Sequence, residues 1–300
     1  SNVLQQLYGA VDTLFVGNYV GDLALAAVGS TGALINLFVG FFLGLSAGAS
    51  VVVAKYFGAG DLKNTEKAIH TSIVTAFIAG IVLTILGWTL TPAILKLMRT
   101  PEAVFDPARI YLQIYFLSMV PMLVYNVGAG IMRAFGNSRE PMMILLFSGM
   151  FHIFANYLFI VRWNMGVAGA AYSTGLSQLI SAIWVILRMV RSNGIDKLEW
   201  NKIKIDGPVL KVIVKISVPA GIQSSLYALA NSIIQTYVNM FGPVAMAGTA
   251  AYYRIDNFLY APMNAIGLAI TTFISQNVGG GKFDRIHHGV KVGLKMSIGI

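Results

Sequence analysis

The segment Gly21–Gly60, GDLALAAVGSTGALINLFVGFFLGLSAGASVVVAKYFGAG, recurs without a gap at Gly242–Gly281, as GPVAMAGTAAYYRIDNFLYAPMNAIGLAITTFISQNVGGG. With one position just upstream, the copies share these identical pairs: Asn18/Asn239, Gly21/Gly242, Ala24/Ala245, Ala26/Ala247, Asn36/Asn257, Gly58/Gly279 and Gly60/Gly281. Each copy is an apolar run that ends in a glycine-rich turn, GAGD or GGGK. A repeat of this long period predicts a chain built from two similar units.

The composition predicts an integral membrane protein. The chain has 300 residues, of which 56% are hydrophobic and only 11% are charged, whereas soluble domains carry about 25% charged residues. So few charged side chains cannot cover a water-facing surface. The net charge of +9 would suggest a nucleic-acid partner in a soluble protein. In a membrane protein it reflects the excess of Lys and Arg on the cytoplasmic side, and we expect no nucleic-acid partner.

A membrane-spanning helix needs about 20 mostly apolar residues. We predict spans at about 1–20, 24–57, 67–98, 108–135, 141–161, 166–190, 209–241 and 245–278, with a ninth from about residue 289. The chain begins with Ser1 in one apolar run and stops within another. A complete second copy would end near roughly residue 440 by doubling of the offset. We therefore expect a fragment with eight to nine of twelve spans.

The basic residues predict the orientation. If the loop 58–66 is cytoplasmic, four of the 21 Lys and Arg residues (Lys96, Arg99, Arg109 and Arg162) lie on the opposite side, Arg254 lies inside a span, and the remaining 16 lie at cytoplasmic ends. This bias sets the topology. It gives the two repeat copies the same orientation, so the repeat is parallel.

The expected fold is therefore an all-α membrane protein of two pseudo-symmetric helical bundles, each a six-helix unit. We assign 1–190 to an N-lobe bundle, 191–208 to a cytoplasmic linker rich in lysine, and 209–300 to the truncated start of a C-lobe bundle. Gly40, Gly44 and Gly48 are spaced so that another helix can approach closely. A parallel repeat of membrane-length helices is a mark of secondary transporters.

Only two acids fall inside the predicted spans, Asp12 and Asp256. Ionisable residues at membrane depth are costly and are retained for function or for pairing. Asp12 has no basic residue within a helical turn, and desolvation would bring its protonation toward neutral pH. We predict that it binds a coupling cation. Asp256 follows Arg254 by two residues, so the two do not face each other along the helix. An ion pair across helices and a role in transport stay open for Asp256.

Other polar residues predict a wet cavity in the first bundle. In the fifth span His152 and Asn156 are four residues apart and share one face; Thr174 and Gln178 repeat this spacing in the sixth. We assign cation coupling to Asp12, His152, Asn156 and Thr174. We assign the substrate cavity to Gln5, Tyr8, Asn126, Gln178, Asn231, Gln235 and Asp256.

Several sequence patterns are absent. The chain contains no G-x-x-x-x-G-K-[ST] loop, so it does not bind ATP by that route, and no H-E-x-x-H motif. His287 and His288 are adjacent and lack the spacing of metal ligands. Nothing resembles a nucleophile with its base. We predict neither an enzyme nor a resident metal or cofactor.

Four segments together resemble the multidrug and toxic compound extrusion (MATE) family: LYGAVDTLFVGNYVGDLALAAVG, GLSAGASVVVAKYFGAGD, GIMRAFGNSREP and MGVAGAAYST. They occur in the family's order, and the resemblance covers the whole chain. It implies twelve helices in two six-helix lobes and cation-coupled antiport of organic, often cationic, drugs.

The resemblance also implies site residues and shows departures. The family's first-helix acid falls on Asp12, a glutamine two turns earlier on Gln5, and the sixth-helix threonine on Thr174. Many members have N-x-x-x-D in the fifth helix, where this chain has His152 and Asn156. A hard cation such as sodium prefers several oxygen ligands with negative charge among them, whereas one carboxylate beside an imidazole suits a proton. The acid that some members carry in the seventh helix is also missing; Asn231 and Gln235 are the polar residues there.

These observations predict a monomeric, multi-pass protein of the cell membrane that is in contact with the lipid bilayer. We expect it to export small organic cations in exchange for H⁺, in preference to Na⁺. Two alternatives stay open. A lipid-linked oligosaccharide flippase has a related architecture but would carry basic residues in its cavity. A membrane scaffold that transports nothing would not need a buried, unpaired Asp12.

Overall fold

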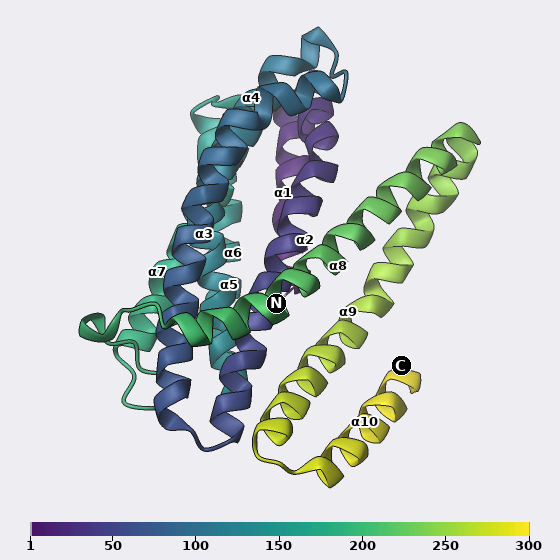
Figure 1. Ribbon diagram of the computed structural model, residues 1–300. Coiled ribbons are helices and arrows are strands. Elements are labelled where there is room, and N and C mark those ends of the chain that lie inside the picture. The colour runs from purple at the N-terminus through teal and green to yellow at the C-terminus, as the bar shows by residue number, and fades with distance from the viewer. Residues whose placement is uncertain (1, 300) are drawn as a thin grey trace.

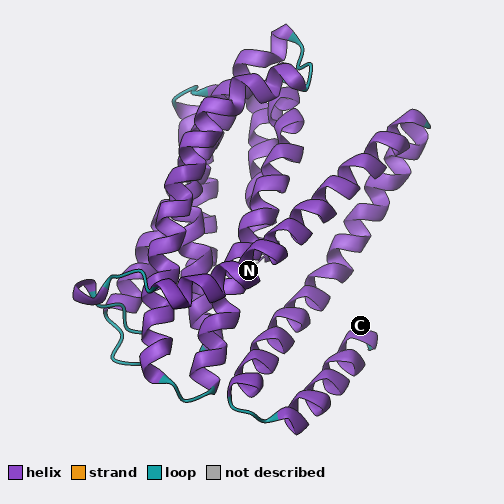
Figure 2. Ribbon diagram, viewed as in Figure 1, coloured by secondary structure: helices purple, strands orange, loops and turns teal. Residues whose placement is uncertain are grey.

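The computed structural model describes the backbone of residues 2–299. It describes their side chains except those of 2–6, 33, 36, 232, 239, 243–247, 250, 251, 253–255, 257–259 and 261. The described backbone is helical, with short connections and no strand (Figure 2). The elements are α1 (Asn2–Tyr19), α2 (Asp22–Gly58), α3 (Leu62–Leu97), α4 (Glu102–Leu117), α5 (Met119–Ala134), α6 (Arg139–Asn156), the π-helix η1 (Tyr157–Arg162), α7 (Gly166–Val190), the 3₁₀-helix η2 (Trp200–Lys202), α8 (Gly207–Met240), α9 (Pro243–Gly279) and α10 (Phe283–Ile298).

The helices lie where the hydrophobic runs predicted them, and the all-α membrane fold is confirmed. By length and composition, five helices among the described residues can cross a membrane, or six if α4 and α5 form one span. That pair is bent by 44° at Ser118 inside the segment predicted as one span, 108–135. Pro121 explains the bend, because it has no N–H to donate to the carbonyl of Leu117 one turn earlier.

Helices α1–α7 form one bundle with α5 at its centre (Figure 1). Nearly all of α5 is buried, and it packs against α2, α3 and α7. Its large side chains Leu123, Ile131 and Met119 lie in the main apolar core together with residues of α2, α3 and α4. A second apolar cluster joins its residues Val124 and Tyr125 to Leu145 of α6 and Val185 of α7.

The repeat found in the sequence is also present in the backbone. The helices α2 and α9 each have 37 residues and begin and end 221 positions apart. Each follows a glycine of positive φ, Gly21 (112°) and Gly242 (89°), and each is followed by another, Gly60 (72°) and Gly281 (66°). Glycine adopts such angles without the steric cost of a Cβ atom. The parallel repeat is therefore confirmed by matching turns as well as by matching helices.

The two copies meet along α2. Its glycines Gly44 and Gly48 face Gly221 and Ser217 of α8 so closely that a Cβ atom on either would collide with backbone. At the end of α2, Gly58 faces the carbonyl oxygen of Gln276. Reciprocally, Gly279 of α9 faces the carbonyl oxygen of Lys55 on α2. Since these two contacts are related by the same offset, the copies cross there as symmetric partners.

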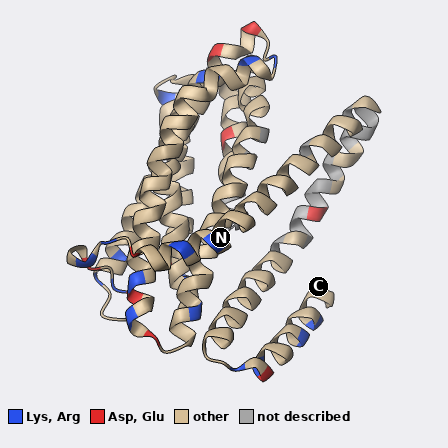
Figure 3. Ribbon diagram, viewed as in Figure 1, with Lys and Arg blue, Asp and Glu red and all other residues tan. Residues whose placement is uncertain are grey.

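Beyond this crossing the two parts separate. Helix α8 leaves the first bundle obliquely, and its far half runs beside α9, away from α1 (Figure 1). Helix α7 ends at Val190 and α8 begins at Gly207, and the segment between them contains the short helix η2. Lys67 of α3 holds this segment through an ion pair with Asp206 (2.7 Å), and Lys202 pairs with Glu66 (2.8 Å). Lys and Arg are concentrated at this end of the bundle (Figure 3).

Candidate functional site

Asp12 lies within α1 and points into the first bundle, where only 1% of the residue is exposed. Three neighbours contact its two carboxyl oxygens. The Asn156 Nδ2 group of α6 donates a hydrogen bond to Oδ1 (2.9 Å), and the Thr174 hydroxyl of α7 donates one to Oδ2 (2.9 Å). His152 of α6 places Nε2 3.0 Å from Oδ1. The carboxyl group is thus buried but surrounded by hydrogen-bond partners, as a polar group away from water requires.

His152 is completely buried and is held on both sides. The ring of Tyr8 stacks on the imidazole, with centroids 4.5 Å apart and planes 14° apart. The Tyr8 hydroxyl shares a hydrogen bond with the Ser148 hydroxyl (2.7 Å), which fixes the tyrosine in turn. Nε2 of His152 also lies 3.1 Å from Asn156 Nδ2 and 3.2 Å from Thr174 Oγ1. The imidazole therefore has little freedom to turn away from Asp12.

The contact between His152 and Asp12 requires a proton. A neutral imidazole carries its single proton on one of its two nitrogens. With the proton on Nε2, the ring donates to the Asp12 carboxylate, and the pair carries one negative charge. With the proton on Nδ1, the Nε2 lone pair faces the oxygen, which must then be protonated. Either arrangement places one proton between His152 Nε2 and Asp12 Oδ1.

Three polar atoms around this pair are buried and have no hydrogen-bond partner among the described residues: His152 Nδ1, Asn156 Oδ1 and Gln178 Oε1. Such atoms are uncommon in folded proteins because each costs free energy when it is unpaired. His152 and Asn156 contact the Asp12 carboxyl group themselves, and Gln178 follows Thr174 by one turn of α7. The cluster is therefore polar enough to take up water, a cation or a ligand that supplies the missing contacts.

The local backbone explains how these side chains meet. Helix α6 changes to the π-helix η1 directly after Asn156, and such a widened turn is common at functional sites. Gly149 leaves space for the Tyr8 ring, because a Cβ atom there would lie 3.3 Å from it. Gly169 lets the start of α7 lie against η1, with the Phe159 Cβ 3.2 Å from the position of an added Cβ. Close packing of these helices sets the spacing of Asp12, Asn156 and Thr174.

Two residues next to the cluster were missed by the sequence analysis. Tyr111 and Tyr115 of α4 lie close enough to Asp12 to interact with its charge. Their spacing of four residues places them on one face of the helix. The pair of tyrosines could have predicted a polar face on this helix. Its spacing could not predict that this face lies against Asp12 of α1.

The four residues assigned to cation coupling all meet in this cluster. Among those assigned to the substrate cavity, Tyr8 stacks on His152, and Gln178 lies one turn along α7 from Thr174. The side chain of Gln5 lies outside the described residues. The Asn126 side chain is buried and donates to the carbonyl of Met122 in its own helix (2.8 Å).

The remaining assigned residues lie elsewhere. Asn231 and Gln235 are on the far half of α8, and Asp256 is on α9, where it accepts a hydrogen bond from Tyr252 (3.4 Å). These helices diverge from the first bundle (Figure 1). Among the described residues no group of three His, Cys, Asp or Glu side chains could hold a metal ion. The first-bundle cluster is thus the one with converging contacts around a buried acid.

The comparisons with known proteins agree with this architecture. The MatE family model matches residues 1–158 and 219–300. Two relatives from Bacillus subtilis (strain 168) are the "Probable multidrug resistance protein YoeA" (28% identical, 98% of this chain and 65% of the relative) and the "Probable multidrug resistance protein YpnP" (29%, 95% and 64%). A solved structure described as "Crystal structure of MATE in the straight conformation" superimposes with a TM-score of 0.90 at 22% identity over 98% of this chain and 66% of that one.

The chain thus spans about 65% of the length of the curated relatives that it matches. The family model covers both copies of the repeat, including α1, α6 and α9. The match therefore includes Asp12, His152 and Asn156 as well as the crossing of α2 and α9. The chain belongs to the MatE family, the multidrug and toxic compound extrusion family, and is a multi-pass membrane protein of a family of transporters and not of enzymes.

Proposed function

We propose that the protein is a cation-coupled antiporter that exports organic, often cationic, compounds by alternating access, with a proton as the coupling ion. The observation that carries the choice of ion is the buried contact of His152 Nε2 with Asp12 Oδ1 at 3.0 Å. The export of drug-like compounds rests on family membership and on the names of the B. subtilis relatives.

The proposed coupling step is the transfer of one proton to the pair of Asp12 and His152. Before uptake, the Asp12 carboxylate accepts hydrogen bonds from Asn156 Nδ2, Thr174 Oγ1 and the imidazole N–H. Uptake of a proton removes the net negative charge. The attraction between this cluster and a cationic substrate is then lost, and the substrate is released. Loss of the proton restores the charge and the affinity for a new substrate.

The donor atoms favour a proton over sodium. An imidazole nitrogen is a poor ligand for a hard cation, which prefers oxygen atoms with negative charge among them. The cluster has one carboxylate, and Asn156 directs its Nδ2 group, not an oxygen, at that carboxylate. Sodium would need this amide to turn so that Oδ1 faces the ion. A proton needs no such rearrangement.

Coupling also requires that the two ligands prefer different conformations. Helix α1 carries Asp12, whereas α6 and α7 carry its three partners. A change in the charge of Asp12 therefore alters the contacts between α1 and the rest of the bundle. Since α2 follows α1 directly and carries the crossing with α8 and α9, a shift of α1 can reach the interface between the two copies.

The experiment is efflux from liposomes that contain the complete protein, with a fluorescent organic cation as substrate. A proton gradient and a sodium gradient are imposed in separate assays on the wild type, Asp12→Asn and the control Asp22→Asn. Asp22 is an exposed acid in the first turn of α2. We expect proton-driven efflux in the wild type and the control and its loss in Asp12→Asn. Efflux that only a sodium gradient drives, or proton-driven efflux that survives Asp12→Asn, would contradict the proposal.

A further inference from the structure

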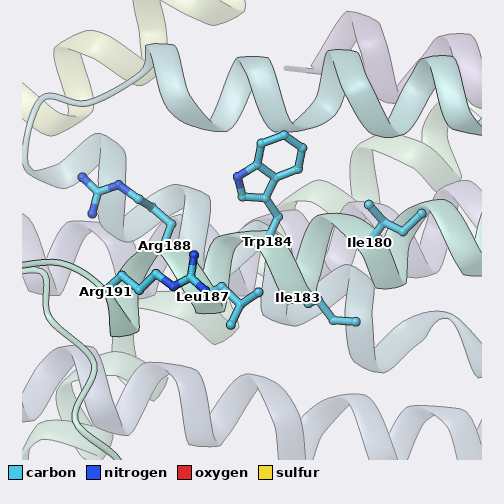
Figure 4. A pocket seen from close by; sticks show the side chains of 6 residues that line it. All are labelled: Ile180, Ile183, Trp184, Leu187, Arg188 and Arg191. Atoms are coloured by element: carbon cyan, nitrogen blue, oxygen red, sulfur yellow. The ribbon is translucent and has the colours of Figure 1, made fainter.

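The outer face of α7 carries a groove of about 460 Å³ that is separate from the Asp12 cluster. It is lined by Ile180, Ile183, Trp184, Leu187, Arg188 and Arg191. They fall on successive turns, with Ile183 and Trp184 three and four residues after Ile180, and Arg191 four and three residues after Leu187 and Arg188. Residues at this spacing form a stripe along the helix. The two arginines lie at one end of the stripe, the indole of Trp184 lies near the middle, and Ile180 lies at the other end (Figure 4). The groove is thus apolar along most of its length and cationic at one end.

The two arginines differ in their charge balance. Arg188 pairs with Glu140 (Nε to Oε2, 2.7 Å) and lies near Asp196 (3.7 Å), so acids already surround it. Arg191 is exposed and forms no ion pair with any described residue. One unbalanced positive charge therefore stands at the cationic end of the groove. A ligand for this end should carry a negative charge.

The length of the stripe matches one leaflet of a membrane. Ile180 and Arg191 are eleven positions apart, which is about 16 Å along a helix. Half of a hydrocarbon core of about 30 Å is about 15 Å. Arg191 follows the last residue of α7, at the end of the bundle where Lys and Arg are concentrated. The charge thus lies at the height of lipid headgroups, and the apolar part runs to the middle of the bilayer.

Trp184 gives the groove a fixed wall. Its ring stacks on Phe147 of α6, with centroids 5.5 Å apart. The indole is nevertheless 42% exposed on the outer side. An aromatic ring held from behind in this way presents a firm apolar surface to an acyl chain. This rigidity reduces the conformational entropy lost on binding.

We propose that this groove binds an anionic glycerophospholipid of the leaflet at the Lys- and Arg-rich end. The phosphate lies at Arg191, and one acyl chain lies along Leu187, Trp184 and Ile183. An ordinary boundary lipid would satisfy the apolar part alone. The unpaired Arg191 adds a preference for lipids of net negative charge, which the cytoplasmic leaflet supplies.

The test uses the fluorescence of Trp184 in the complete protein, with every other tryptophan, including Trp88, Trp163 and Trp200, replaced by phenylalanine. This variant is reconstituted in phosphatidylcholine vesicles that contain increasing fractions of brominated phosphatidylglycerol or, separately, brominated phosphatidylcholine. Bromine quenches an indole in contact with the acyl chain. We expect half-maximal quenching at an about fivefold lower fraction of the anionic lipid, since one basic residue near the surface gives a preference of about this size.

Three variants make the result specific. Arg191→Gln should abolish the preference, whereas Arg191→Lys, which keeps the charge, should retain most of it. Lys211→Gln removes another exposed cation at the same end, near the start of α8, and should leave the preference unchanged. A matched protein in which Trp88 is the only tryptophan reports on α3 at the opposite end and should show no preference.

Three results would overturn the proposal. Equal quenching by both lipids, or a preference that survives Arg191→Gln, would reduce the groove to ordinary boundary lipid. Quenching by neither lipid would mean that protein covers the stripe. Because the readout is contact with lipid and not efflux, failure here leaves the proposed antiport untouched.

Discussion

The first helix pair, α1 and α2, and its copy, α8 and α9, have matching turns, and α2 and α9 begin and end at corresponding residues, but the two pairs differ in where their acids lie. Asp12 of α1 corresponds by the offset to Ile233 of α8. Asp12 is 1% exposed within a polar cluster, whereas half of Ile233 is exposed. Conversely, Asp256 of α9 corresponds to Ile35 of α2. The repeat therefore preserves backbone geometry, while each copy has its acid on a different helix.

The comparison teaches that the two copies are under different physical constraints. The turn glycines and the glycines at the α2–α9 crossing recur because backbone angles and close approach admit no other residue. No such constraint acts on the polar positions. They depend on which helices surround them, and α1 is enclosed by α6 and α7, whereas the far half of α8 lies apart from that bundle.

The largest expected effect tests this asymmetry directly. Asp12→Asn should lower proton-driven efflux by roughly 100-fold, near the upper end of coupling between sites, because the amide cannot take up a proton. Asp256→Asn should lower it much less, since no histidine contact of Asp256 exists among the described residues. Both are measured in liposomes at equal protein content. Equal losses in the two variants would break the comparison.

At the crossing of α2 and α9, corresponding substitutions in the two copies should have similar effects on stability. Gly58→Ala and Gly279→Ala each place a Cβ atom against the carbonyl oxygen of the other helix, at Gln276 and Lys55. Each should destabilise the protein by about 1–3 kcal/mol, the typical cost of overpacking. Thermal unfolding in detergent measures this cost. Gly29→Ala, in the same helix but with open space around it, is the control, and a stability as low as that of Gly58→Ala would contradict the explanation.

A smaller effect is expected for the partner of the acid. His152→Gln keeps a donor beside Asp12 but cannot gain a charge. It should lower proton-driven efflux by about tenfold and change its dependence on pH, within the usual range of coupling between sites. Efflux is measured between pH 5.5 and 8, which are about one unit below and 1.5 units above the ordinary pKa of histidine. An unchanged pH profile would show that Asp12 titrates without the imidazole.

The smallest effect concerns the linker between the two copies. The hydrogen bond from Lys67 lowers the pKa of the Asp206 carboxyl, with a further contribution from the N–H of Val209. A lowered pKa means that the pair is complete above the ordinary value of 3.8 and is lost only as the pH falls through the lower native value. Between pH 8 and 5 the attachment should therefore not change.

Asp206→Asn removes this attachment at neutral pH. Hydrogen exchange at Glu199, whose N–H donates to His70 Nε2 (3.1 Å), should accelerate roughly two- to fivefold, as expected for an exposed ion pair. Asp284→Asn, in the first turn of α10, serves as the control. No acceleration in Asp206→Asn would show that the backbone contacts alone hold the linker.

Much of the fold followed from local patterns. The lengths of the apolar runs predicted the helices, and the repeated glycines predicted the matching turns of α2 and α9. The bend at Ser118 was missed because the apolar run 108–135 continues through Pro121, and an apolar run does not report a change of direction. For the site, Asp12 was apparent because an acid in an apolar run is costly. The spacing of four residues placed His152 beside Asn156, and Thr174 beside Gln178, on shared faces.

The sequence by itself determined that the chain is a helical membrane protein, that it repeats in parallel, and that Asp12 is its exceptional residue. These properties depend on composition, on the repeat period and on the residue types at the turns, all of which can be seen without knowing how the helices pack. Only the tertiary structure decided that His152 lies 3.0 Å from Asp12 and that Tyr111 approaches the same carboxyl group, while Asp256 stands on a helix that diverges from this bundle. These relations join residues that are distant in sequence, and the packing of α1, α4, α6 and α7 against one another sets them.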